Sequence, residues 1–117
     1  MAEIGKHETR YQTVDELVQY FKERIAAHGK AQFIGVFDHF AHTEAIGGNI
    51  ASDIRAAVDV IFCFSLSLPN PQVLAVRPRS IGIAEVDDHF VVSFMEAPMQ
   101  LANDAMEAWV KGLRDSG

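Results

Sequence analysis

The sequence lacks several features that would point to a specialised environment. It has a single cysteine, Cys63, which excludes an intramolecular disulfide and indicates a reducing compartment. No apolar run approaches the roughly 20 residues that a membrane span needs, and the first residues lack the apolar stretch of a signal peptide. We therefore expect a cytoplasmic protein that does not enter a membrane.

Basic residues are also scarce. The 117 residues include 16 Asp and Glu against 10 Lys and Arg, and the net charge of -6 repels phosphate backbones. Nucleic acid is therefore not expected as a partner. The hydrophobic share of 49% and the charged share of 22% are typical of a folded globular chain. At this length we expect a single domain over residues 1–117 that builds its own core.

Apolar residues recur at helical spacing near each end of the chain. Thr13 followed by Glu16 matches a capping box, and the apolar stripe after it stops at Gly29, which predicts a helix over residues 14–28. Pro98 suits the first turn of a second helix near the C-terminal end. The apolar stripe of that helix comprises Met99, Ala102, Met106, Trp109, Val110 and Leu113.

The segments between these helices are mostly extended. Their apolar residues fill both faces or alternate with polar ones, as in strands of a sheet that is covered on one side. Residues 3–12 are interpreted as an edge strand or an arm, and residues 39–57 as a short helix or turn, a loop and a further helical turn. We expect strands at 32–37, at 58–66, at 73–86 with a bend at Pro78, and at 90–96 after a turn at 87–88. In the second strand, one face carries Val58, Val60, Phe62, Phe64 and Leu66.

The predicted order of elements is that of an α+β fold, with one layer of helices on one antiparallel sheet. Four features stand out along this order: Thr13-Val14, Asp38-His39, Asn70-Pro71 and the strand from Val92 to Glu96. In these features the chain resembles, over residues 13–98, the family catalogued as domain of unknown function 302. The resemblance implies a curved antiparallel sheet of the TATA-binding-protein-like type, with the N-terminal and C-terminal helices on one face, and pairing into homodimers. It implies little about function, because that family has no settled activity.

The densest group of residue types with catalytic chemistry is Asp38, His39 and His42. If Asp38 caps a short helix, the two histidines share one face and could bind a metal or a substrate proton. A zinc site needs further ligands, for which Cys63 and Glu96 are the candidates. Alternatively, Asp38 only caps the turn and the histidines are half-buried hydrogen-bonding groups. Cys63 has apolar neighbours and fits a buried core residue better than a nucleophile.

Two arginines form the second group of interest. Arg77 and Arg79 are two positions apart on a segment expected to be extended, so their guanidinium groups are expected on the same side of the sheet. Together they could bind a carboxylate or a phosphate. Alternatively, they pair with Glu85, with Glu96 or with an acidic group of a partner subunit.

These groups lead to three hypotheses about function. The first, which demands least of the residues and assigns no catalytic residue, is a homodimeric domain that binds a small anionic ligand in a groove between sheet and helix. The second is an enzyme in which Asp38, His39 and His42 hold zinc or another divalent metal. The third is a structural interaction module whose polar residues make salt bridges between subunits. The groove of the first hypothesis is lined by His39, His42, Arg77, Arg79 and Glu96.

Overall fold

The computed structural model describes residues 1–64 and 68–114, and in these ranges the chain forms one five-stranded antiparallel sheet. The strand order is β1-β5-β4-β3-β2, so β1 and β2 are the edges. Two short 3-10 segments, η1 (Lys6–Glu8) and η2 (Pro71–Ala75), interrupt the connections. The main elements are β1 (Ala2–Gly5), α1 (Val14–Ala27), β2 (Gln32–Asp38), α2 (His39–Ala45), β3 (Ile54–Cys63), β4 (Arg79–Val86), β5 (His89–Ser93) and α3 (Gln100–Lys111).

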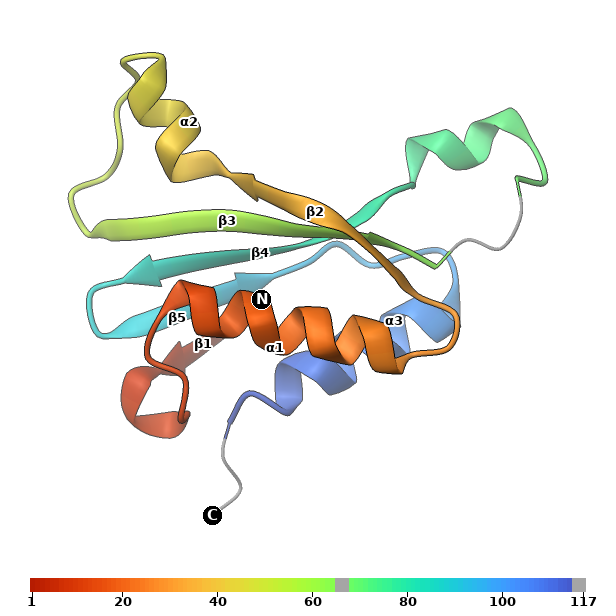
Figure 1. Ribbon diagram of the computed structural model, residues 1–117, viewed down its shortest axis with the longest axis horizontal. Helices are drawn as coiled ribbons and strands as arrows, with labels where there is room; N and C mark the ends of the chain where they lie inside the picture. The colour runs from red at the N-terminus through yellow and green to blue at the C-terminus, as the bar shows by residue number, and fades with distance from the viewer. Residues whose placement is uncertain (65–67, 115–117) are drawn as a thin grey trace.

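The helices divide the two sides of the sheet unequally. Figure 1 shows α1 and α3 on one side, and α2 and η2 on the other side at opposite ends of the strands. We call the side under α1 and α3 the covered face and the other side the open face. Strand alternation sends Val58, Val60 and Phe62 of β3 to the covered face, where they are buried. The core is therefore built between this face and the two long helices.

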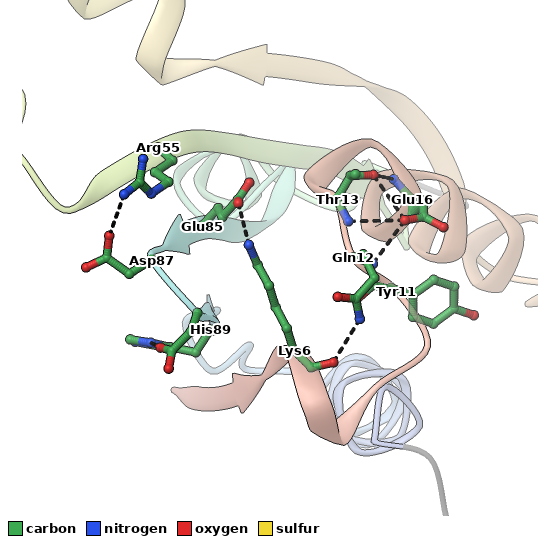
Figure 2. A network of polar contacts seen from close by, with 10 residues as sticks. Lys6, Tyr11, Gln12, Thr13, Glu16, Arg55, Glu85, Asp87 and His89 are labelled. Atoms are coloured by element: carbon green, nitrogen blue, oxygen red, sulfur yellow. Dashed lines mark hydrogen bonds and ion pairs between the residues drawn. The ribbon is translucent and has the colours of Figure 1, made fainter.

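The two long helices are fixed by specific polar contacts. At the start of α1, the Thr13 hydroxyl accepts from the Glu16 N–H (3.1 Å) while the Glu16 carboxylate accepts from the Thr13 N–H (3.1 Å), which is the expected capping box (Figure 2). Farther along α1, the Tyr20 hydroxyl donates to the Trp109 carbonyl of α3 at 2.5 Å. This buried bond joins the two helices, and burial raises the pKa of Tyr20.

Much of the predicted architecture is confirmed. The fold is α+β with an antiparallel sheet, and the helix expected over residues 14–28 is α1. The apolar face predicted for residues 58–66 is buried at Val58, Val60, Phe62 and Phe64, whereas Leu66 lies outside the described residues. The sheet is not strongly curled, and the TATA-binding-protein-like type stays a prediction.

Three expected segments differ from the structure. Residues 73–77 are not a strand, because Pro71 begins the 3-10 segment η2 and the strand starts only at Arg79. The helical turn expected up to residue 57 is instead the start of β3, whose first residues pair with β4. The last strand ends at Ser93, since pairing with β4 stops there.

Candidate functional site

Asp38, His39 and His42 lie close in sequence but serve three different purposes. An Asp38 carboxylate oxygen accepts from the Ala41 N–H at 2.9 Å and caps α2, as expected. The His39 Nε2 lies 2.7 Å from an Asp59 carboxylate oxygen on β3. The His42 ring packs against Phe37, with 5.3 Å between ring centres.

The residues proposed to complete a zinc site do not join them. Cys63 is a free, half-buried thiol on β3, so the expectation of a buried core cysteine is wrong; strand alternation places it on the open face with its partner Gln32. Glu96 is exposed and borders a separate hollow beside α3 with Glu107, Lys111 and Arg114. In the described ranges, no three His, Cys, Asp or Glu side chains are placed to hold a metal ion. The metal hypothesis therefore gains no support.

The two arginines border a small apolar hollow beside α3, of about 120 Å³. Arg79 donates from Nη1 to the Val76 carbonyl at 3.3 Å and from Nη2 to the Met95 carbonyl, which makes it a tie between two connections of the chain. Its Nε is buried and has no partner within the described part of the chain. Glu85, one of the acidic partners considered for the arginines, instead accepts from Lys6 at 2.7 Å (Figure 2).

A trough runs across the open face between α2 and η2. It consists of two adjoining hollows of about 370 and 160 Å³ that share Asp59, Gly82 and Ser93. His39 borders it at the α2 end, and Arg79 borders it at the η2 end. We call this feature the open-face trough. Its other lining residues include Ala57, Ala84 and Val91 on the sheet, Ser80 on β4, and Ala75, Val76 and Pro78 at the η2 end.

Small residues on the floor keep the polar groups of the trough accessible. A Cβ atom added at Gly82 would lie 3.2 Å from an Asp59 carboxylate oxygen and 3.4 Å from the Ser93 hydroxyl. Glycine therefore leaves room for both groups at the point where the two hollows meet. The Asp59 side chain is 30% exposed and the His39 side chain is 48% exposed, so both can contact a molecule in the trough.

Of the residues that line the open-face trough, the sequence analysis had identified only His39 and Arg79. It had not identified Asp59, Ser80, Gly82 or Ser93. One signal was present: Asp59 is a carboxylate in the middle of the apolar run from Ala56 to Cys63, on the face opposite Val58 and Val60. An ionisable residue in that position usually has a partner.

The comparison with protein families gives one result. The model of the Family of unknown function (DUF6858) matches residues 1–115. The chain belongs to this family. The match is to DUF6858 and not specifically to domain of unknown function 302, the family that the sequence was said to resemble.

Membership of DUF6858 does not by itself assign an activity, because the function of this family is unknown. No curated protein and no solved structure was similar enough to the chain to count as a match. Within the described residues, no helix of this DUF6858 protein has the length and apolar character needed to cross a membrane. Its function therefore has to be argued from the open-face trough itself.

Proposed function

We propose that the chain binds a small polar molecule with an acidic group in the open-face trough and does not catalyse a reaction on it. The observation that carries this proposal is the His39–Asp59 pair, held at 2.7 Å above a floor of small residues that leaves the trough unfilled. Small-molecule sites are typically concave surfaces with a few convergent polar groups.

The polar groups favour an acidic ligand over a basic one. The His39–Asp59 contact uses Nε2, so Nδ1 is the ring nitrogen through which His39 would bind a ligand. The hydroxyls of Ser80 and Ser93 can each donate one further hydrogen bond. Against the single carboxylate of Asp59, the lining contains His39 and Arg79; the Arg79 guanidinium is bonded to the Val76 and Met95 carbonyls and adds positive charge nearby. A carboxylate or phosphate group matches this set better than an amine.

Binding accounts for the geometry better than catalysis does. A hydrolytic site pairs its histidine with a nucleophile on one ring nitrogen and an orienting carboxylate on the other. Here Asp59 is the described side chain that hydrogen-bonds to the His39 ring. The pair therefore suits recognition of a ligand that completes its hydrogen bonds.

Thermal unfolding in the presence of single compounds tests the proposal. A panel of small mono- and dicarboxylates and inorganic phosphate should include at least one compound that raises the Tm by several degrees. A ligand at about ten times its Kd contributes about 1.4 kcal/mol. His39→Gln should remove the response. His89→Gln should retain it, because His89 pairs with Asp88 at 3.2 Å at the β4–β5 turn, away from the trough.

The location of binding can be read from amide chemical shifts. A stabilising compound should perturb the amides of Gly82 and Ser93 more than those of Glu107 and Lys111, which border the hollow beside α3. Perturbations confined to the α3 hollow would overturn the proposal. So would a response that His39→Gln leaves intact.

A further inference from the structure

One edge of the sheet is closed by the chain itself. The Lys6 N–H bonds to the Asp88 carbonyl (2.9 Å) on the β5 side, so the neighbouring groups of Gly5 and Glu3 face away from β5. Both are satisfied: the Gly5 N–H donates to a Glu8 carboxylate oxygen at 2.8 Å, and the Glu3 carbonyl accepts from Arg114 at 2.6 Å. Glu8 and Arg114 also pair with each other at 3.2 Å. The outer edge of β1 therefore has few unpaired backbone N–H and C=O groups with which another strand could form hydrogen bonds.

The opposite edge has no comparable protection. In the ranges that the structure describes, no side chain and no loop hydrogen-bonds to the backbone of β2 on its outer side. Its apolar side chains are exposed as well: Phe33 by 37%, Ile34 by 58%, Val36 by 43% and Phe37 by 38%. A seven-residue edge strand with this character is a template for another strand, and such edges are normally blunted by lysine, proline or a covering segment.

We propose that β2 pairs antiparallel with β2 of a second copy of this chain, so that two sheets join into one ten-stranded sheet. The inference goes beyond the proposed ligand site and does not depend on it. Residues 31–37 carry no charged side chain, in a chain whose net charge of -6 repels other copies elsewhere on its surface. An edge that is neutral in such a chain is suited to another copy of itself.

The ends of the strand are complementary under this symmetry. Antiparallel pairing brings Asp38, at the end of one β2, toward the first half of the other, where Phe33 and Ile34 lie. Lys22 of α1 supplies a positive charge there, since its ammonium lies 4.9 Å from the centre of the Phe33 ring. Asp38 of each copy therefore approaches a basic side chain of the other.

The faces of the sheet select one register. Gly35 and Phe37 lie on the open face as partners of Ile61 and Asp59, whereas Val36 lies on the covered face opposite Val60. Residues that pair across an antiparallel junction lie on the same face of the sheet, whereas neighbouring residues of one strand lie on opposite faces. The two-fold axis must therefore lie at one residue, which pairs with the same residue of the second copy, and not midway between two neighbours. An axis at residue 35 or earlier would run the pairing through the bulge between Phe33 and Gly35, and an axis at residue 37 would leave only residues 36–38 to pair before α2 begins.

An axis at Val36 pairs residues 34–38 of the two copies and is the register we propose. It sets Val36 against Val36 of the second copy and Phe37 against Gly35. A Cβ added at Gly35 would have no atom within 4 Å, so the space above this glycine is free for an aromatic ring from the second copy. An aromatic residue opposite a glycine is a favourable cross-strand pair.

Sedimentation equilibrium tests whether this edge is the interface. The parent chain should be a dimer at micromolar concentrations, and Ile34→Lys should weaken self-association by at least about tenfold, because both copies place a charge at the junction. Ile46→Lys is the matched control, since Ile46 is 69% exposed and follows α2 outside the edge. It should leave the dimer intact.

A cysteine placed on the axis tests the register. In a Cys63→Ala background, Val36→Cys should form a disulfide-linked dimer under mild oxidation, and Glu3→Cys on the closed edge should not. Circular dichroism confirms that each variant is folded. A parent chain that is monomeric at micromolar concentrations would overturn the proposal and leave the edge to a strand of another protein. A dimer that resists Ile34→Lys and does not cross-link through Val36→Cys would overturn it equally.

Discussion

The two edge strands show that one sheet can end in two opposite ways. β1 has four residues, and its Ile4 is buried with 2% exposure, while Glu8 and Arg114 bond to the Gly5 N–H and the Glu3 carbonyl on its outer side. β2 has seven residues, and several of its apolar side chains are exposed. The difference arises because the segments after β1 and after α3 bring charged side chains to the β1 edge, whereas β2 continues directly into α2, which contacts β3. Edge protection here depends on neighbouring side chains more than on the strand itself.

The largest expected effect contrasts an isoleucine on each edge. Ile4→Ala should lower the free energy of unfolding by about 2–4 kcal/mol, because it empties a buried position of the core. Ile34→Ala makes the same chemical change at a residue that is 58% exposed, and should cost less than about 0.5 kcal/mol in dilute protein. Urea denaturation of both variants measures the contrast. Equal losses would show that the edges are not as different as their burial indicates.

The next effect is expected from opening the closed edge. Replacing Glu8 and Arg114 together by Ala frees the Gly5 N–H and the Glu3 carbonyl, so both edges become templates for pairing. Light scattering should then detect species larger than those of the parent chain. The matched control replaces Glu23 and Lys111 by Ala, which removes the same two charges from exposed helix positions. If the two double variants have the same size distribution, the polar cover of β1 does not limit assembly.

The closed edge should also be sensitive to acid. The hydrogen bond from the Gly5 N–H holds the pKa of Glu8 below its ordinary value of 4.5. A carboxylate with a lowered pKa stabilises the fold above that ordinary value, and its contribution is lost as pH falls through the folded pKa. Between about pH 5 and pH 3, the Tm of the parent should therefore fall more than that of Glu8→Gln. Glu44→Gln, on α2, should follow the parent profile.

Zinc is expected to have the smallest effect. A metal held by Asp38, His39 and His42 would brace the end of β2, but these side chains are engaged in three separate contacts. At neutral pH, zinc should leave the Tm unchanged in the parent and in the His39→Ala, His42→Ala double variant alike. A zinc-dependent rise in the parent that the double variant lacks would contradict this and revive the metal hypothesis.

The parts of the fold that sequence could predict are those with a local physical cause. The reciprocal bonds of Thr13 and Glu16 form within one helical turn, and the alternation from Val58 to Phe64 needs only a pleated strand with one buried face. The 3-10 segment η2 was missed because its valine and leucine resemble those of a strand, although they are not buried. Residue type alone predicted a strand here, because residue type does not show whether a side chain is buried.

The candidate site was harder to predict because its residues meet only through long-range pairing. His39 and Asp59 are 20 residues apart, and the β2–β3 register brings them together. The hydroxyl of Ser93 lies near Asp59 because β4 lies between their strands and has glycine at position 82. No short motif contains these relations. His39 was selected from the sequence for a different reason, its spacing from His42.

Arg79 has a consequence for how the molecule opens. Its guanidinium bonds to the carbonyl of Val76, just after η2, and to the carbonyl of Met95, on the way to α3. Two connections separated by a hairpin thus bond to the same side chain, and neither can leave the sheet without breaking a bond to Arg79. In native-state hydrogen exchange, amides around these connections should behave as one cooperative unit. Arg79→Met, which retains much of the apolar stem, should split that unit into two opening events of different free energy.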